Sequence, residues 1–147
     1  MELLIRSFHE LTNRQLYEIL QLRQLVFVVE QDCPYLDCDD KDQEAFHLCL
    51  VEGDQLLAYT RVLSPGTSYT DYSSIGRVVN HPNHRRKGLG KSIMQSSIHF
   101  CKEQYPEHKI KISAQCYLDD FYQDLGFIPT GETYLEDGIP HQSMILK

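Results

Sequence analysis

A strand pattern, a basic loop with glycines and a helical pattern follow one another in the middle of this chain, and this order constrains its fold most. The loop at residues 85–90 reads Arg-Arg-Lys-Gly-Leu-Gly, so it holds three cations and two glycines. Residues 74–79 before it have a strand pattern, and from Leu89 onward the apolar spacing is helical. A helix N-terminus leaves about four backbone N–H groups without intrahelical partners and carries a partial positive charge. The order therefore predicts a binding site for phosphate groups at the loop.

Two common phosphate-binding loops do not fit these residues. A Walker loop requires a glycine five residues before the Gly-Lys-Ser of residues 90–92, and Arg85 stands at that position. A dinucleotide-binding fingerprint requires a glycine three residues after Gly90, where the chain has Ile93. Two interpretations remain, an R-x-x-G-x-G motif for another phosphate ligand and an exposed basic turn that starts a helix.

The R-x-x-G-x-G motif resembles the pyrophosphate-binding motif of the GNAT acetyltransferase superfamily, whose ligand is acetyl-CoA. A second segment agrees with this resemblance, because a strand pattern is followed by a short helical segment with Tyr122 and by the pair Gly126-Phe127. The resemblance implies that Tyr122 is the general acid, and the alternative is an aromatic residue packed beside Phe121. The cofactor-binding residues that it implies are Val78, Val79, Arg85, Arg86, Lys87, Gly88, Leu89, Gly90, Lys91, Gln115 and Tyr122.

Motifs near both ends of the chain resemble the ElaA-like branch of the GNAT superfamily, so the resemblance spans nearly the whole chain. The resemblance does not identify the physiological acceptor of the acetyl group. The residues that carry it are Arg23, Val26 to Gln31, Cys33 to Tyr35, Asp39, Asp42, His47 and Asp137 to His141.

The GNAT resemblance implies an α/β (α+β) fold with a mixed, mostly antiparallel central sheet flanked by helices. It also implies one parallel strand pair that splays apart at the acetyl-CoA site. The chain length of 147 residues suits a single domain, 1–147. The strands predicted from the residue pattern are 3–7, 46–52, 55–63, 74–79, 109–114, 127–135 and 142–146. The resemblance implies that 74–79 and 109–114 are the parallel pair.

The first helix is predicted to run from Thr12, with Gln15 as its capping-box partner, to about Val28. Arg23 and Glu30 fall on the same side as its apolar stripe, at heptad spacing. A charge that points inward needs a partner or a water-filled cleft. Either an ion pair orients this helix, or Glu30 faces the acceptor at a place away from the phosphate loop.

Two histidines are candidates for the catalytic base, because an unperturbed imidazole titrates near pH 6.5. His47 and His141 lie at the entries of predicted strands, and a structural role is the alternative for each. Together with Arg23 and Glu30 they form the predicted acceptor side. The cysteines lack the paired C-x-x-C spacing of structural zinc sites, so no metal is predicted.

The charge distribution separates one basic cluster from an acidic chain. A formal net charge of −7 argues against nucleic-acid binding, whereas the cations at 85, 86, 87 and 91 suit a polyanion such as CoA. No apolar run approaches the roughly 20 residues of a membrane span, and the first residues lack a signal-peptide pattern. Five cysteines, an odd number, suit a reducing compartment. We therefore predict a cytoplasmic protein without membrane or nucleic-acid partners, either a monomer or a dimer.

The GNAT resemblance, with which these patterns agree, implies an enzyme that transfers an acetyl group from acetyl-CoA to a small-molecule or peptide amine by direct attack. One alternative is an acyl-homoserine-lactone-synthase-like acyltransferase, because Arg23, Phe27, Asp39, Asp42 and residues 61–65 faintly resemble that family. The chain has no tryptophan, which departs from that family's N-terminal pattern. The other alternative is a non-catalytic CoA-binding sensor that keeps the loop without turnover.

Overall fold

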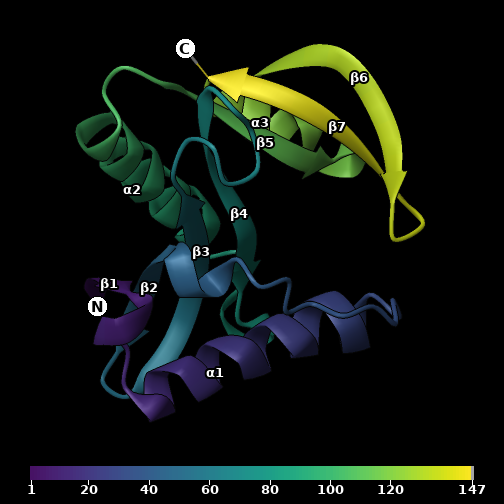
Figure 1. Ribbon diagram of the computed structural model, residues 1–147. Coiled ribbons are helices and arrows are strands. Elements are labelled where there is room, and N and C mark those ends of the chain that lie inside the picture. The colour runs from purple at the N-terminus through teal and green to yellow at the C-terminus, as the bar shows by residue number, and fades with distance from the viewer. Residues whose placement is uncertain (147) are drawn as a thin grey trace.

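The computed structural model describes residues 1–146, in which one seven-stranded sheet has helices on both sides (Figure 1). The order across the sheet is β1-β2-β3-β4-β5-β7-β6. The strands are β1 (Glu2–Ser7), β2 (Phe46–Glu52), β3 (Gln55–Leu63), β4 (Tyr72–Asn80), β5 (Lys109–Gln115), β6 (Ile128–Glu136) and β7 (Ile139–Leu146). The helices are α1 (Asn13–Arg23), a π-helix (Gln24–Glu30), α2 (Leu89–Gln104) and α3 (Asp119–Asp124), accompanied by short 3-10 turns.

Neighbouring strands are antiparallel except for β4 and β5, which run parallel. The parallel pair is joined only at its start, where Tyr72 pairs with Lys109 and Ser73 pairs with Ile110. Beyond these two pairs the strands separate toward their carboxyl ends. The predicted mixed sheet with a splayed parallel pair is therefore confirmed.

A β-bulge interrupts β4 on its other edge, opposite β3. Arg61 pairs with Gly76 and Tyr59 pairs with Val79, so two residues of β4 face one residue of β3. Arg77 in the bulge has a φ of 51°, in the left-handed region that non-glycine residues rarely adopt. A bulge bends its strand and changes the direction of the neighbouring groups. Here it lies where β4 has separated from β5.

Two clusters of buried apolar residues lie on opposite faces of the sheet, one under each long helix (Figure 1). The larger cluster includes Ile93 and Met94 of α2, and the smaller one includes Ile19 and Leu22 of α1. Tyr59 of β3 is fully buried against α1. The N-terminal half of the sheet is thus covered on both faces.

The start of α1 agrees with the prediction, but its end does not. The Thr12 side chain accepts a hydrogen bond from the Gln15 N–H at 3.1 Å, and the Gln15 side chain accepts one from the Thr12 N–H at 2.9 Å. This capping box confirms the predicted first turn. However, α1 ends at Arg23, and the π-helix Gln24–Glu30 continues in the same direction.

The π-helix changes which side of the segment each residue faces. Its closing bonds run from the Gln31 N–H to the Val26 carbonyl and from the Cys33 N–H to the Val28 carbonyl, a spacing of five residues. Because each turn is wider than an α-helical turn, the heptad rule no longer keeps position 30 on the inner side. Glu30 is exposed, so the prediction that it points inward was wrong.

The C-terminal hairpin is longer than predicted. β7 begins at Ile139 rather than at Gln142, and Glu136 pairs with Ile139 across a two-residue turn. Asp137 and Gly138 in that turn have φ values of 52° and 79°, as a type I′ hairpin requires. The hairpin projects beyond the other strands, with β6 at the free edge of the sheet (Figure 1).

Candidate active site

The phosphate loop lies between β4 and α2, as the sequence predicts. Gly88 is the N-cap of α2 and has a φ of 75°, and Arg86 before it has a φ of 63°. The first N–H groups of α2 cannot bond within the helix, so they are free to bind an anion. The side chains of Arg85, Lys87 and Lys91 are exposed around them. The loop therefore offers backbone donors and positive charge to the same ligand.

Close packing at Gly90 joins the start of α2 to the end of β4. A Cβ atom on Gly90 would lie 3.3 Å from Nδ2 of Asn80 and 3.7 Å from Cζ of Phe121. The Oδ1 atom of Asn80 is buried and has no hydrogen-bond partner within residues 1–146. An unpaired buried oxygen beside the phosphate loop is suited to a donor from a bound ligand or water. The sequence analysis missed Asn80, although an amide at the last position of the strand before the loop was a usable signal.

Tyr122 lies on α3. The neighbouring residue, Phe121, packs beside Gly90 in the first turn of α2. The Tyr122 ring packs edge-on against Phe121 at 5.0 Å and against Phe127 at 6.1 Å between centroids. Burial raises the pKa of the phenol to about 12, and the nearby Tyr117 adds to the shift. The hydroxyl is therefore protonated at neutral pH. It makes no hydrogen bond to another group of residues 1–146, so it is free to donate to a ligand.

Glu30 contacts the phosphate loop, contrary to the expectation that it lies away from it. Both of its carboxylate oxygens bind the Arg85 guanidinium, and the Nη1–Oε2 distance is 3.0 Å. The two side chains are 41% and 43% exposed, so the pair is open to solvent. In this arrangement the Glu30 carboxylate is bound to the Arg85 guanidinium, which a phosphate of the ligand would otherwise bind.

A Glu30→Gln variant is expected to bind CoA up to about fivefold more tightly, because an exposed ion pair contributes about 0–1 kcal/mol that the ligand must replace. Isothermal titration calorimetry with CoA at low and high salt measures the effect, which salt should reduce. Glu44→Gln changes the net charge equally at an exposed site of another segment and serves as the control. Unchanged or weaker CoA binding by Glu30→Gln would contradict this competition.

Arg23 lies in a buried ion-pair network and is fully enclosed. Its Nε is 2.7 Å from Oδ2 of Asp37, and its Nη1 is 2.7 Å from Oδ1 of Asp42. Arg61 reaches the same Asp42 oxygen at 3.0 Å, and Arg77 reaches Oδ1 of Asp37 at 2.8 Å. The network fastens the segment after the π-helix to β3 and to the bulge of β4. The geometry thus favours the interpretation that Arg23 orients the first helix.

His47 belongs to the same network. Its Nε2 is 2.9 Å from the Asp42 carbonyl oxygen, and its Nδ1 is 2.6 Å from the Tyr59 hydroxyl. A neutral ring that donates from Nε2 and accepts at Nδ1 satisfies both contacts. Burial lowers the pKa of the imidazole below its ordinary value, despite the opposing effect of Asp42. Both ring nitrogens are bound within the protein, so neither can contact the amine that accepts the acetyl group. His47 therefore lies outside the candidate site.

His141 and Gln115 lie side by side on β7 and β5, near the place where β4 and β5 separate. The Nδ1 atom of His141 is 2.7 Å from the Ile139 carbonyl oxygen, and its Nε2 is 3.3 Å from Oε2 of Glu136. Gln115 donates from Nε2 to Oε1 of Gln31 at 3.4 Å, which links β5 to the end of the π-helix. The His141 contacts stay within the β6–β7 hairpin, whereas the Gln115 contact joins β5 to the segment after the π-helix.

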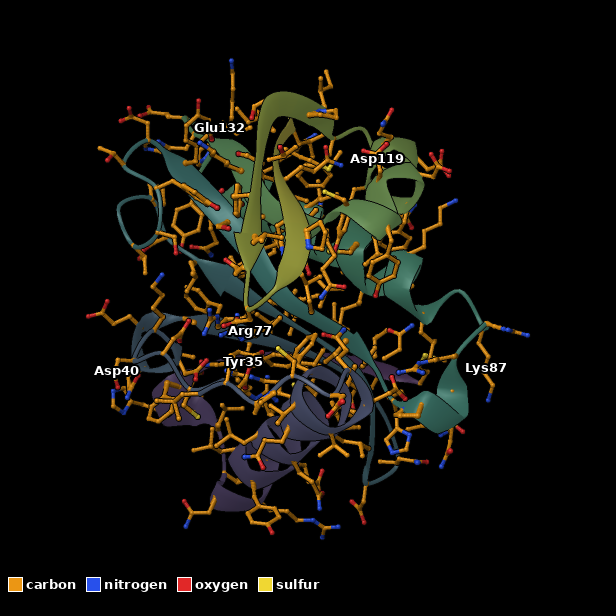
Figure 2. The ribbon with its side chains drawn as sticks, turned by 90° about the vertical axis from the view of Figure 1, so that its right-hand side faces the viewer. Tyr35, Asp40, Arg77, Lys87, Asp119 and Glu132 are labelled. Atoms are coloured by element: carbon orange, nitrogen blue, oxygen red, sulfur yellow. The ribbon has the colours of Figure 1, made fainter. Side chains whose placement is uncertain are left out.

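The labelled side chains in Figure 2 mark two parts of the candidate site that lie apart. Lys87 projects from the phosphate loop at one edge, whereas Tyr35 and Arg77 lie close together below the β6–β7 hairpin. The Tyr35 hydroxyl donates to Oδ1 of Asp37 at 3.0 Å, the carboxylate that also binds Arg77. The phosphate loop and the cluster around Tyr35 and Arg77 are thus formed by different segments.

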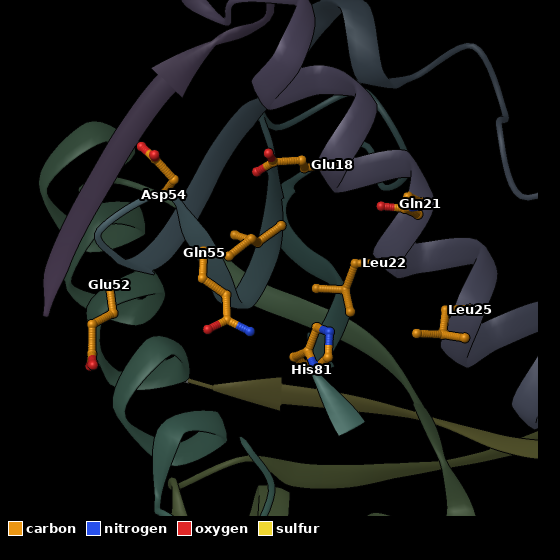
Figure 3. Close-up of a pocket in the computed structure, with 9 residues that line it drawn as sticks. Glu18, Gln21, Leu22, Leu25, Glu52, Asp54, Gln55 and His81 are labelled. Atoms are coloured by element: carbon orange, nitrogen blue, oxygen red, sulfur yellow. The ribbon is translucent and has the colours of Figure 1, made fainter. Parts of the chain in front are cut away.

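A separate open cavity of about 650 Å³ lies between α1 and the β2–β3 turn (Figure 3). Leu22, Leu25 and Leu56 contribute apolar walls, and its carboxylates are Glu18, Glu52 and Asp54. Negative charge repels a polyanion. This cavity is therefore unsuited to the phosphates of CoA.

Residues 1–146 contain neither a candidate membrane span nor a cluster of metal-ligating side chains. No helix in this range is long and apolar enough to cross a membrane. The same residues contain no group of three or more His, Cys, Asp or Glu side chains placed to hold a metal ion.

Known proteins resemble this chain over nearly all of its length. A family model described as "Acetyltransferase (GNAT) domain" matches residues 11–147. Protein ElaA of Escherichia coli strain K12 is 41% identical over 137 residues, which cover 92% of this chain and 89% of ElaA. The crystal structure of Escherichia coli ElaA matches with a TM-score of 0.92, 38% identity and 100% of both chains covered. The crystal structure of an acyl-CoA N-acyltransferase from Pseudomonas aeruginosa matches with a TM-score of 0.94, 37% identity and 99% of both chains covered.

A more distant match is a CoA-dependent acyl-homoserine lactone synthase, BjaI, whose structure contains S-adenosylmethionine and isopentyl-CoA. Its TM-score is 0.70 at 18% identity, over 97% of this chain and 82% of that chain. At this identity the match shows a shared fold and nothing about the substrate.

Proposed function

The chain belongs to the GNAT acetyltransferase family, in its ElaA-like branch, and on that premise we propose that it transfers an acetyl group from acetyl-CoA to an amine. The family fold makes the chain an acyl-CoA N-acyltransferase with acyl-CoA as co-substrate. The observation that carries the proposal is the alignment of the glycine-capped start of α2 with the opening between β4 and β5. One ligand can place its phosphates at the start of α2 and its thioester in the opening between β4 and β5.

The phosphate end is assigned to the backbone N–H groups of residues 86–91, with the Arg85 and Lys87 side chains as additional donors. Asn80, with its unpaired Oδ1, and Gln115, with its unpaired Oε1, supply acceptors along the path from the loop to the opening. These residues fit a long polar ligand that enters between the strands. We assign the same path to the pantetheine arm of CoA.

The thioester end is assigned to the segment after the bulge, at Val78 and Val79. A backbone N–H there would donate to the thioester carbonyl and stabilise the charge that builds on its oxygen as the amine attacks. The bond from the amine nitrogen to the acetyl carbon forms, and the carbon–sulfur bond breaks. Tyr122 then gives its proton to the departing thiolate.

His141 is our candidate for the base that removes the proton from the attacking amine. Its Nε2 faces Glu136, a carboxylate that would stabilise the imidazolium, and it lies beside Gln115. His47 is enclosed, and Glu30 is bound to Arg85. Neither is therefore proposed as the base.

A Tyr122→Phe variant is expected to lose about 100-fold in kcat, the lower end of general acid catalysis, because a thiolate is a tolerable leaving group. CoA affinity should remain, since the ring and its packing are kept. Single-turnover measurements isolate the chemical step from product release. Tyr117→Phe, an exposed tyrosine just before α3, serves as the control. An unchanged single-turnover rate in Tyr122→Phe would leave Tyr122 as a packing residue.

Thiol release from acetyl-CoA in the presence of a panel of amines tests the proposed function directly. Release that depends on both the amine and the protein supports the enzyme. If CoA raises the melting temperature but no amine in the panel supports release, the sensor interpretation is favoured. The panel should include small amines, amino sugars, peptides with free N-termini and lysine-containing peptides.

A cytoplasmic location is part of the proposal. All five cysteines are free thiols, and Cys33, Cys49 and Cys101 are buried. Free thiols of this kind are typical of a reducing compartment. The oligomeric state stays a prediction of monomer or dimer.

A further inference from the structure

The C-terminal half of the sheet has one packed face and one polar face. On the packed face, Ile112 of β5 and Met144 of β7 belong to the core under α2. On the other face, Gln115 pairs with His141, and His141 pairs with Tyr134. Paired residues of neighbouring strands project to the same side of a sheet. These three residues therefore form a row that leads from the opening between β4 and β5 to the free edge at β6.

Two polar atoms on this face have no partner. Oε1 of Gln115 and Oγ of Ser143 are buried and make no hydrogen bond within residues 1–146. Ser143 is only 2% exposed, and it pairs with Ser113 in the row next to His141. A buried polar group without a partner costs free energy, so such groups usually mark a place where a polar ligand or water binds.

Aromatic rings line both ends of the same face. The Tyr134 ring is stacked with the His141 ring at 6.3 Å between centroids and an angle of 16°, and its hydroxyl bonds to the Ser113 hydroxyl. At the far end of β5, the Lys111 ammonium lies 4.9 Å from the centroid of the Tyr69 ring. This face thus already holds one ammonium group against a tyrosine, an interaction that the exposed Tyr134 ring can repeat with a ligand.

Carboxylates surround the Tyr134 end. Glu136 follows Tyr134 by two residues and lies 3.3 Å from the His141 ring, while Glu132 precedes Tyr134 by two residues. Burial raises the pKa of the Tyr69 phenol to about 12, and the nearby Tyr134, Glu136 and Glu132 add to the shift. Lys111, over the Tyr69 ring, is the cation nearer the start of β5. An entering ammonium is therefore attracted toward Tyr134 and repelled from the start of β5.

We propose that this face binds an acceptor with two ammonium groups, a diamine, with its reacting nitrogen beside Gln115 and its second nitrogen over Tyr134 between Glu132 and Glu136. The inference rests on the proposed function and specifies its substrate class. The backbones of Gln115 and Tyr134 are two strand spacings apart, roughly 10 Å. The Tyr134 ring leans toward β5, where its hydroxyl bonds to the Ser113 hydroxyl, so the two nitrogens would lie closer together than this. A five-carbon chain between the nitrogens suits this span. The reacting nitrogen gains the acetyl group and loses a proton to His141, and the second nitrogen stays charged.

The test compares kcat/KM for 1,5-diaminopentane and 1-aminopentane, which differ in the second ammonium alone. We expect a preference of about tenfold or more for the diamine, above the twofold advantage of having two equivalent amines. Tyr134→Leu and Glu132→Gln should each reduce this ratio about threefold or more. Tyr17→Leu on α1 and Glu107→Gln in the turn before β5 are exposed controls that should keep it. Equal kcat/KM for the two amines, or a ratio unchanged in both test variants, would overturn the inference.

Calorimetric titration of both amines into the protein saturated with CoA separates this inference from the proposed function. About tenfold tighter binding of the diamine, reduced in Tyr134→Leu, supports the site even if no amine is acetylated. Equal affinities overturn the site even if thiol release shows that the chain is an enzyme. If no thiol is released with either amine or with any other acceptor, this result contradicts the proposed function but not the binding site.

Discussion

A Gly88→Val variant is expected to lose the rise in melting temperature that CoA causes in the unaltered protein. Gly88 has a φ of 75° and caps the helix whose free N–H groups are proposed to bind the phosphates. A Cβ atom there would meet no other atom of the protein, so the added side chain would project into the space left for the ligand. The branched residue also disfavours the left-handed backbone by about 1–2 kcal/mol and would displace the loop. Both effects act on the same phosphate contacts.

The measurement is the melting temperature with and without CoA at about 100 times its dissociation constant. A ligand at that concentration stabilises the native state by about 2.7 kcal/mol, which corresponds to a rise of about 5–10 °C for a domain of this size. Gly53→Val places the same residue at a positive φ of 60° in the β2–β3 turn, where a Cβ atom also meets nothing. This control should melt lower but keep the full response to CoA. A normal response in folded Gly88→Val would exclude this loop as the phosphate site.

The cofactor end of the site could be predicted because its signals are local in the chain. Glycines at 88 and 90, the cations around them and the strand before them lie within twenty residues. Each has a physical role that does not depend on distant segments. The first turn of α1 could be predicted for the same reason, since Thr12 and Gln15 cap the helix with their own side chains.

The orientation of Glu30 could not be predicted from the apolar pattern. The heptad rule assumes an α-helix, and the π-helix after Arg23 has no distinct apolar period that would reveal it. The hairpin boundary was missed for a related reason, because Pro140 in β7 lacks an N–H group and weakens the strand pattern.

The acceptor end depends on contacts between segments far apart in the sequence. Arg77 reaches Asp37 across forty positions, and Gln115 reaches Gln31 across eighty-four. The sequence shows which charges are present, but it does not show which of them pair. Tyr134 and Ser143 were missed because only the strand register places them beside His141.

An Asp42→Asn variant is expected to lose about 3 kcal/mol of unfolding free energy at neutral pH. Asp42 is the carboxylate that two enclosed arginines share, with Oδ1 at 2.7 Å from Arg23 and 3.0 Å from Arg61. Removing one partner of a buried ion pair leaves an uncompensated charge, which costs about 3–5 kcal/mol, and the asparagine oxygen can still accept one hydrogen bond. For this chain length the loss corresponds to roughly 10 °C in melting temperature.

Asp40→Asn is the matched control, because Asp40 is exposed in the same segment and has a φ of 65° that asparagine also tolerates. Urea unfolding at pH 7 should show little change in this variant. A similar loss in both variants would mean that the segment responds to its total charge rather than to the buried pair.

The pH dependence gives an independent test of the same network. Burial alone would raise the pKa of Asp42, but its contacts with Arg23 and Arg61 lower it below the ordinary value of 3.8. A carboxyl with a lowered pKa in the folded state adds stability above its unfolded pKa and loses it as the pH falls through the folded pKa. The difference in unfolding free energy between the unaltered protein and Asp42→Asn should thus be full at pH 7 and should narrow below about pH 3.8. A difference that stays constant down to pH 2.5 would mean that packing, rather than the shared charge, makes Asp42 important.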